Sequence, residues 1–202
     1  KPESSEGWEI GLDSHWADGK YQFQLAWFDQ NLKDEIDGFV YDPLSGLYTA
    51  NNKGNDSTRK GVETIFDMQF SQYFTLSASY TYTDATEKDA AGNSFEEVRR
   101  PKHMANLSAN YQFLDNRGNL NLNVNYTGSQ LDVFYSPVTY MSDIVNIDSY
   151  TVVDLAVSWK LTRSLELTGR IKNLLDEQYE EVLGFVRPGR AVYGGLRGRF
   201  DF

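Results

Sequence analysis

The chain has 202 residues, a formal net charge of -10 and no cysteine, and 40% of its residues are hydrophobic. The acidic balance argues against binding to the phosphate backbone of a nucleic acid, and the absence of cysteine excludes thiol catalysis, zinc fingers and disulfide bridges. No apolar run approaches the roughly 18 residues that a transmembrane helix needs, so a helical membrane protein is excluded as well.

Runs of alternating apolar and polar residues recur along the whole chain and predict β-strands. Between residues 74 and 83, the even positions are aromatic or aliphatic and the odd positions are serine or threonine. A period of two over this length indicates a strand with one apolar face. The runs number about nine and lie at residues 8–16, 21–27 with a polar continuation to about 41, 59–70, 74–83, 105–113, 120–126, 153–161, 165 to about 179, and 192–202.

The connections between these strands alternate in length. Short turns lie at residues 17–20, 71–72, 115–118 and 162–164, and long polar loops lie at residues 42–55, 84–97, 133–149 and 180–189. In bacterial outer-membrane barrels the short turns face the periplasm and the long loops face outward. The sequence therefore predicts an all-β, antiparallel transmembrane barrel, with residue 1 on the loop side and residue 202 on the short-turn side. Because a single-chain barrel of this kind has both ends on one side, we expect residues 1–202 to be a C-terminal part of a larger barrel.

A soluble β-sandwich or a small closed barrel would show a similar alternation. Three features favour the membrane barrel over the sandwich. The strands are long, and their polar face is rich in Asn, Thr and Ser. Tryptophan and tyrosine also crowd the strand ends, as an interfacial girdle requires. These aromatic residues are Trp8, Trp16, Tyr21, Tyr73, Tyr82 and Trp159.

Several motifs resemble, in order and spacing, those of the TonB-dependent outer-membrane receptors. Lys-Pro-Glu at residues 1–3 resembles the segment that enters a late barrel strand, and Lys-Gly-Val-Glu at 60–63 resembles one of the strands that follow. The basic segment at 99–103 resembles the opening of a further strand. Asn-Leu-Leu-Asp at 173–176 resembles a motif near the family's end, with Leu175 in place of the usual aromatic residue. The resemblance implies a barrel of about 22 strands, with the plug domain and the earlier strands outside residues 1–202.

Within that family, the segment Gly-Phe-Val-Arg-Pro-Gly-Arg at 184–190, together with the paired arginines, is most similar to the cobalamin receptors, although siderophore receptors share the general plan. This resemblance places Arg99 and Tyr135 at ligand-contacting positions on the extracellular side. A guanidinium can donate hydrogen bonds to amide carbonyls or phosphate, and a tyrosine ring can pack against a flat macrocycle. Two simpler readings stay open: Arg99 belongs to a basic rim that pairs with lipopolysaccharide phosphates or acidic loops, and Tyr135 is an ordinary loop aromatic.

The resemblance implies active transport, in which loops capture a scarce ligand, a plug closes the lumen, and the periplasmic protein TonB pulls on the plug. The implied partners are cobalamin or another scarce ligand, outer-membrane lipid and lipopolysaccharide, TonB through the plug, and the barrel-assembly machinery. Phe202 and Phe200, at alternate positions of the last strand, resemble the signal that this machinery reads. No cofactor is implied. A passive porin, or a small stand-alone barrel without a plug, is the alternative.

Catalysis is not expected. The two histidines, His15 and His103, are predicted at opposite ends of their strands, about a membrane thickness apart. The acidic clusters at 34–37, 96–97 and 176–181 lack the twelve-residue spacing of a calcium-binding loop. We therefore expect solvated loop charges there and no metal site.

Overall fold

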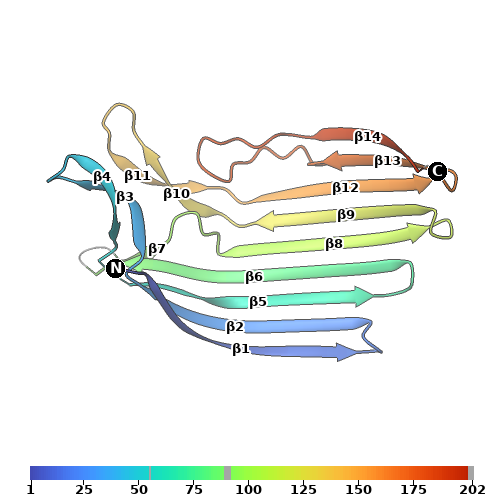
Figure 1. Ribbon diagram of the computed structural model, residues 1–202, viewed down its shortest axis with the longest axis horizontal. Coiled ribbons are helices and arrows are strands. Elements are labelled where there is room, and N and C mark those ends of the chain that lie inside the picture. The colour runs from blue at the N-terminus through green and yellow to red at the C-terminus, as the bar shows by residue number, and fades with distance from the viewer. Residues whose placement is uncertain (55, 89–91, 200–202) are drawn as a thin grey trace.

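The computed structural model describes residues 1–54, 56–88 and 92–199 (Figure 1). The regular elements in this part of the chain are β-strands, which confirms the all-β prediction. They are β1 (Ser4–Trp16), β2 (Tyr21–Lys33), β3 (Ile36–Asp42), β4 (Leu47–Asn52), β5 (Ser57–Gln69), β6 (Phe74–Lys88), β7 (Ser94–Glu96), β8 (His103–Phe113), β9 (Gly118–Thr127), β10 (Gln130–Tyr135), β11 (Ser142–Ile147), β12 (Tyr150–Lys160), β13 (Leu165–Lys172) and β14 (Ala191–Gly198). Among the described residues, no helix is long and apolar enough to cross a membrane.

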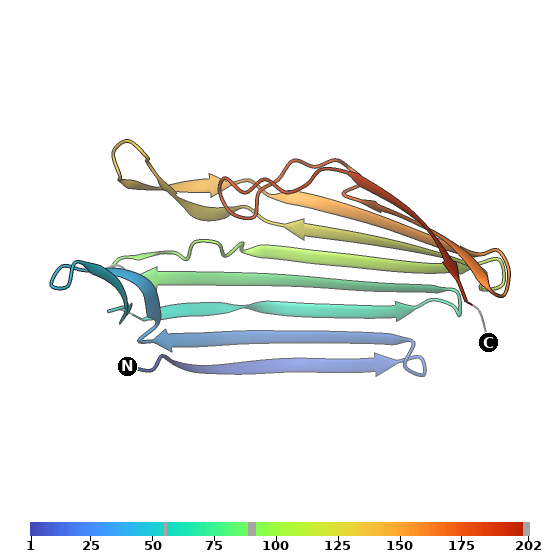
Figure 2. The same ribbon diagram turned by 45° about the horizontal axis from the view of Figure 1, so that its top comes forward.

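The strands pair as an antiparallel meander. The main sheet follows the order β1-β2-β5-β6-β8-β9-β12-β13-β14, and β7 joins it by pairing with β6. The nine strands of this path correspond to the nine or so runs that the sequence predicts. The pairs β3–β4 and β10–β11 form separate hairpins, which lie at the same end of the sheet as residue 1 (Figures 1 and 2). Within the described residues the path is open, with β1 and β14 as its edges.

The strand register gathers apolar residues on one face of the sheet. Leu76 in β6 lies opposite Met68 in β5 and Ala109 in β8. On the next two strands, Leu122 lies opposite Ala109, and Leu155 lies opposite Leu122. Because residues paired across antiparallel strands point to the same side, this row forms a continuous apolar face. The alternate residues, mostly Thr, Ser and Asn in the middle strands, form the polar face, as predicted.

Aromatic rings mark both ends of the apolar face. At the short-turn end the ring contacts run across the first strands of the main sheet: Trp16–Tyr21, Tyr21–Phe70, Phe70–Phe74 and Phe74–Tyr111. Toward the other end of β1, Trp8 meets Trp27 edge to face, with ring centroids 4.5 Å apart. From Trp8 to Trp16 the strand spans about 26 Å, which is the scale of the roughly 25 Å apolar band of outer-membrane barrels.

The sheet is a single layer that buries little of its own apolar surface. Among the described residues, only Ala85 and Ile147 are hydrophobic and buried. By contrast, Ile10 and Leu196, near opposite edges of the sheet, are each 64% exposed. A water-soluble protein rarely leaves so continuous an apolar face uncovered, whereas lipid covers such a face in a membrane barrel.

Gly61 shows why the Lys-Gly-Val-Glu stretch carries a glycine. A Cβ atom at this position would collide with the carbonyl oxygen of Tyr82 in β6 and with the ring of Phe28 in β2. Only a residue without a side chain lets the three neighbouring strands approach this closely.

Three predictions about element boundaries are wrong. The strand that begins at residue 21 ends at Lys33 and does not continue to 41, because Asp34 takes a left-handed conformation (φ 54°) that turns the chain. The strand that begins at residue 165 ends at Lys172 rather than near 179, because Asn173 has φ 50°. The predicted long loops also carry strands of their own, namely β4, β7 and β11.

Candidate ligand-binding site at the loop end

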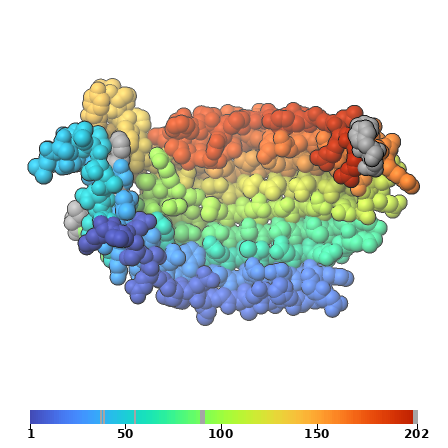
Figure 3. Space-filling view, in the orientation of Figure 1, coloured from blue at the N-terminus to red at the C-terminus, as the bar shows by residue number. Residues whose placement is uncertain are grey.

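The β3–β4 and β10–β11 hairpins project beyond the body of the sheet at one end, which we call the loop end (Figure 3). Both residues predicted to contact a ligand lie there. Arg99 follows β7 in the turn before β8, and Tyr135 is the last residue of β10. Although the two are 36 positions apart in the chain, the fold brings them to the same end of the sheet.

Arg99 is fixed to β10 through both its backbone and its side chain. Its left-handed backbone (φ 58°) accompanies an N–H that donates to the carbonyl oxygen of Leu131 at 2.7 Å. Its Nε donates to Oδ1 of Asp132 at 2.8 Å. The Arg99 side chain nevertheless stays 52% exposed, so part of the guanidinium remains open to solvent and to a ligand.

Asp132 accepts hydrogen bonds from three segments at this end of the molecule. It is fully buried, at 0% exposure. Besides Arg99, the backbone N–H of Val133 donates to Oδ1 at 2.7 Å, and that of Leu183 donates to Oδ2 at 2.8 Å. Asp132 therefore joins the Arg99 turn, β10 and the loop at 180–189. A second link between the last two comes from Gln130, whose Nε2 donates to the carbonyl oxygen of Glu181 at 2.9 Å.

These donors also set the charge of Asp132. Burial by itself raises the pKa of a carboxyl group, but the N–H groups of Leu183 and Val133 and the guanidinium of Arg99 outweigh burial and hold the pKa of Asp132 below its usual value. The carboxylate is therefore ionised at neutral pH, when it attracts Arg99 most strongly.

The two hairpins present aromatic side chains to solvent. Tyr135 is 70% exposed, and Tyr140 in the turn of the β10–β11 hairpin is 87% exposed. On the β3–β4 hairpin, the rings of Tyr41 and Tyr48 are in contact, with centroids 5.6 Å apart, and both side chains are more than half exposed. Tyr135 lies three positions beyond Asp132 in β10, about 10 Å along the strand. Side chains three positions apart in a strand point to opposite faces, so Arg99 and Tyr135 share the loop end without lying side by side.

A second cluster of charges, centred on Arg59, anchors the start of the β3–β4 hairpin. Arg59 in β5 binds Glu97 through two hydrogen bonds, of 3.0 and 2.8 Å, and its Nη2 donates to Glu35 at 3.2 Å. The hydroxyl of Ser57 also donates to Glu35. Glu35 and Glu97 are only 13% and 10% exposed. Their prediction as solvated loop charges is therefore wrong, because Arg59 draws both into a largely buried ion-pair cluster.

The basic residues after Arg99 pair with acids of the chain itself. Lys102 forms an ion pair with Glu96, and Nε of Arg100 lies 3.6 Å from Glu97. A basic rim was expected to pair either with lipopolysaccharide phosphates or with acidic loops, and the structure shows pairing with acidic residues of the chain. The Arg59 cluster and the Asp132 junction were both missed from the sequence, because each depends on contacts between segments far apart in the chain.

The two histidines lie at opposite ends of the sheet, as predicted. His103 begins β8 at the loop end, and His15 lies near the short-turn end of β1, where its Nε2 is 2.9 Å from Asp13. Within the described residues, no three His, Asp or Glu side chains gather as metal ligands. Phe200 and Phe202, predicted to carry the assembly signal, lie outside the described residues.

The family of TonB dependent receptor-like β-barrels matches residues 1–174. This chain belongs to that family. TonB-dependent receptors are transporters and not enzymes, and the family predicted from the sequence motifs is confirmed.

Solved TonB-dependent receptors superpose on nearly the whole chain. The ferripyoverdine receptor of the outer membrane of Pseudomonas aeruginosa gives a TM-score of 0.80 at 19% identity, covering 98% of this chain and 27% of that one. The ferric-catecholate import receptor Fiu of Escherichia coli gives 0.76 at 20% identity, covering 99% and 28%. The FrpB iron transporter of Neisseria meningitidis gives 0.76 at 15% identity, covering 99% and 32%. At these identities the likeness shows a shared fold, and the chain spans about a third of each receptor or less. The cobalamin subclass and the ligand contacts of Arg99 and Tyr135 stay predictions.

Proposed function

We propose that residues 1–202 form part of the wall and of the ligand-capturing surface of an outer-membrane receptor for the TonB-dependent uptake of a scarce metal chelate. The observation that carries this proposal is the junction at Asp132, which holds Arg99, β10 and the loop at 180–189 together beside an exposed aromatic hairpin. A rigid base reduces the ordering cost of binding. The exposed rings of Tyr135 and Tyr140 then provide contact area.

A ferric siderophore is the first candidate ligand. It is supported by the descriptions of the superposed receptors, which name ferripyoverdine and ferric catecholates. A ferric catecholate carries aromatic rings and negative charge. The hairpin tyrosines offer rings for stacking, and the open part of the Arg99 guanidinium offers N–H donors and positive charge.

Cobalamin is the second candidate, favoured by the segment at 184–190 and the paired arginines, which resemble the cobalamin receptors. Its flat macrocycle would pack against Tyr135, and its amide carbonyls or phosphate would accept hydrogen bonds from Arg99.

The proposed transport follows the plan of the family. The apolar face would meet outer-membrane lipid, with lipopolysaccharide around the loop end, and the polar face would line the lumen. A plug outside residues 1–202 would close the lumen, and TonB would act on that plug from the periplasm. The barrel-assembly machinery would insert the protein and read the alternation that ends in Phe200 and Phe202.

The test is a titration of the full-length receptor in detergent with cyanocobalamin and with a panel of ferric siderophores, followed by tryptophan fluorescence or calorimetric heat. Tight binding of a siderophore would support the first candidate, and tight binding of cobalamin would support the second. Tyr73→Ala, at the short-turn end, is the matched control for Tyr135→Ala and should leave the affinity unchanged. If no ligand binds, and cells with and without TonB accumulate all of them equally, the receptor proposal is wrong.

A further inference from the structure

The turn between β12 and β13 meets the residue after β14 at the short-turn end of the sheet (Figures 1 and 2). The backbone N–H of Arg199 donates to the carbonyl oxygen of Ser164 at 2.9 Å. Together the two segments border a hollow of about 110 Å³, which we call the rim cavity. Because a water molecule takes up about 30 Å³, the rim cavity has room for a polar group larger than water, such as a phosphate. The cations that line it are Lys160, Arg163, Arg197 and Arg199.

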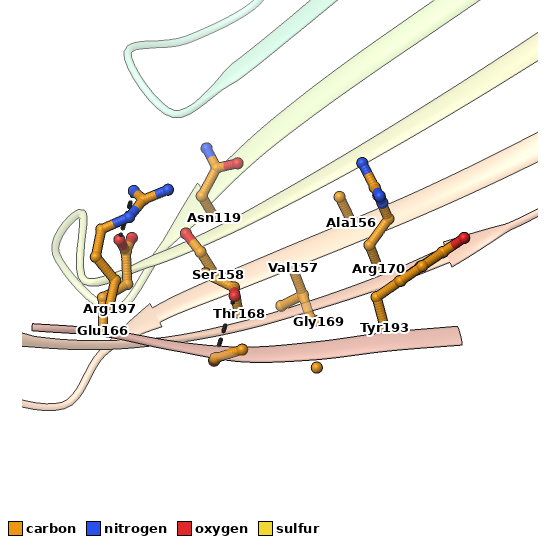
Figure 4. A pocket seen from close by; sticks show the side chains of 12 residues that line it. Asn119, Ala156, Val157, Ser158, Glu166, Thr168, Gly169, Arg170, Tyr193 and Arg197 are labelled. Atoms are coloured by element: carbon orange, nitrogen blue, oxygen red, sulfur yellow. Dashed lines mark hydrogen bonds and ion pairs between the residues drawn. The ribbon is translucent and has the colours of Figure 1, made fainter. Parts of the chain in front are cut away.

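The rim cavity carries an excess of positive charge. Glu166 is the acidic residue that lines it, and its Oε2 accepts a hydrogen bond from Nη1 of Arg197 at 3.1 Å (Figure 4). In the part of the chain that the structure describes, no carboxylate lies within ion-pair distance of Lys160, Arg163 or Arg199. Three cations at this corner are therefore available to an anion from outside.

The excess is particular to this corner of the short-turn end. The turns at 17–20 and 115–118 each carry one acidic and one basic residue, and the turn at 71–72 carries no charge. The chain as a whole has a net charge of -10. A cluster of unpaired cations is thus the opposite of what the composition leads one to expect.

The backbone of the turn is held firmly in place. Nη2 of Arg117, from the neighbouring turn, donates to the carbonyl oxygens of Lys160 and Leu161, each at 3.2 Å. The backbone N–H groups of Leu161 and Thr162 both donate to the carbonyl oxygen of Leu165, at 2.9 and 3.2 Å. The turn therefore offers few free backbone groups to a polypeptide, and its cations project from a fixed frame.

An apolar surface begins directly beside these cations. Trp159, Leu167 and Leu196 lie opposite one another on β12, β13 and β14, and they are 43%, 46% and 64% exposed. Residues paired in this way point to one side of a sheet, so the three form a row of the apolar face. Each is one position, about 3.3 Å, from a residue that lines the rim cavity. A lysine or arginine spans this distance easily, because its stem lies along apolar surface while its charged head stays in water.

We propose that the rim cavity binds the phosphate of an anionic phospholipid, whose acyl chains lie against Trp159, Leu167 and Leu196. Clustered cations beside a membrane attract anionic lipids, and basic pockets at the membrane surface bind their headgroups. A guanidinium also donates two parallel hydrogen bonds to a phosphate. The inference rests on the proposed function, because it requires the apolar face to meet lipid and the short turns to face the periplasm. Lipopolysaccharide is proposed around the loop end, so the lipid at this opposite rim is phospholipid.

Two other occupants fit the rim cavity less well. A free phosphate would gain only exposed ion pairs, which contribute little, and it would leave the apolar row uncovered. An acidic polypeptide would find few free backbone groups in the turn. A phospholipid uses both features of this corner, because its phosphate and its acyl chains belong to one molecule.

The direct test is native mass spectrometry of the full-length receptor in detergent, titrated with phosphatidylglycerol or with phosphatidylcholine of the same acyl chains. We expect tighter binding of phosphatidylglycerol. Arg163→Gln and Arg199→Gln should each weaken that binding about fivefold, the scale of one cation near an anionic membrane surface. Lys20→Gln, in the turn at 17–20, is the matched control and should leave it unchanged. Equal affinities for the two lipids, or equal losses in Lys20→Gln and the two arginine variants, would overturn the inference.

A second measurement locates the bound lipid. Bromine atoms on an acyl chain quench tryptophan fluorescence only at short range, so brominated phosphatidylglycerol should quench the full-length receptor more than brominated phosphatidylcholine does. This difference should disappear in Trp159→Phe and remain in the matched control Trp8→Phe, near the loop end. A difference that survives Trp159→Phe would place the lipid elsewhere and overturn the inference.

Two outcomes would identify the other occupants. Release of brominated phosphatidylglycerol by an equal concentration of inorganic phosphate would show a site for a free anion. A carbodiimide cross-link from the amine of Arg163→Lys to an Asp or Glu outside residues 1–202 would show a bound polypeptide. Either result would overturn the phospholipid site.

The two proposals fail in different ways. TonB-dependent uptake by a receptor without a preference for phosphatidylglycerol would reject the phospholipid site alone. A preference that depends on Arg163, in a protein that takes up none of the ligands, would support the phospholipid site and reject the proposed function.

Discussion

The buried carboxylate of Asp132 offers the sharpest test of how the loop end is held together. Asp132→Ala removes the acceptor of three hydrogen bonds, from Arg99, Val133 and Leu183. We expect the loop at 180–189 to detach from β10 while the sheet below it stays folded, because the sheet itself does not depend on these bonds.

The size of the effect follows from the exposure of each donor. Arg99 is half exposed, so water can replace its bond to Asp132 and that loss contributes little. Val133 and Leu183 each lose the acceptor of a part-buried backbone N–H, at about 1.5 kcal/mol apiece. The sum of about 3 kcal/mol corresponds to a roughly hundredfold increase in opening of the loop, since 1.4 kcal/mol is a factor of ten. Asp132→Asn keeps one acceptor oxygen and should cost about half as much, or roughly tenfold.

Hydrogen exchange of the full-length receptor, read by mass spectrometry in detergent at neutral pH, measures this opening. Peptides covering 180–189 and 130–135 should exchange roughly a hundredfold faster in Asp132→Ala and tenfold faster in Asp132→Asn, with no change in β6. Asp143→Ala, at an exposed position of β11, is the matched control. Wild-type exchange in both Asp132 variants, or an equal acceleration throughout β6, would refute the anchoring role.

Three further predictions concern the same end of the molecule. Arg59→Gln should release the β3–β4 hairpin and speed its hydrogen exchange tenfold to hundredfold, the scale of a lost charged hydrogen bond. The control Lys60→Gln removes a looser 3.8 Å ion pair to Asp84 and should leave the exchange of this hairpin unchanged. Burial raises the pKa of Glu97, but Arg59, Arg100 and Lys53 lower it overall, and the pKa of Asp132 is likewise lowered. The stability that these two carboxylates contribute is therefore complete above their ordinary pKa of about 4, and it is lost as the pH falls through the lowered values. Limited proteolysis of the hairpins should accelerate near pH 3. Acceleration that begins between pH 6 and 8 would contradict this. Tyr135→Ala should weaken ligand binding by about 1 kcal/mol without changing exchange at 180–189, and faster exchange there would mean that Tyr135 supports the fold instead of contacting the ligand.

The strands within the apolar band were predictable because one face of each strand is apolar and the other is polar, so apolar and polar residues alternate along the sequence. β6 shows where this signal ends. Its alternation is clear from 74 to 83, but the strand continues to Lys88 and pairs there with β7. Beyond the apolar band no face needs to be apolar, so backbone pairing continues while the sequence pattern disappears. For the same reason, β4, β7 and β11 were predicted as loops.

The site was predictable only in part. Motif resemblance placed Arg99 at the loop end, but nothing local marked Asp132 as buried, since its partner Leu183 is 51 residues away. The one available signal was a carboxylate at an even position of the short polar–apolar alternation at 130–135. Glu35 and Glu97 were taken for solvated charges because their common partner, Arg59, is 24 and 38 residues distant. Buried charges of this kind depend on tertiary pairing, which periodicity does not encode.

The open edges of the sheet lead to a prediction about the chain by itself. β1 is 13 residues long, and within the described residues its outer edge pairs with no strand. Roughly half of its backbone groups therefore point away from β2, and each unsatisfied group costs several kcal/mol in lipid. The total far exceeds the 5–15 kcal/mol by which folded proteins are stable. β14 presents the same problem at the other edge, so both edges must be paired by strands other than these, or by each other. We expect residues 1–202, refolded alone in detergent, to show no heat-modifiable migration on gels, whereas the full-length receptor should show it. Heat-modifiable migration of the isolated chain would mean that β1 and β14 close on each other and that these strands form a small barrel by themselves.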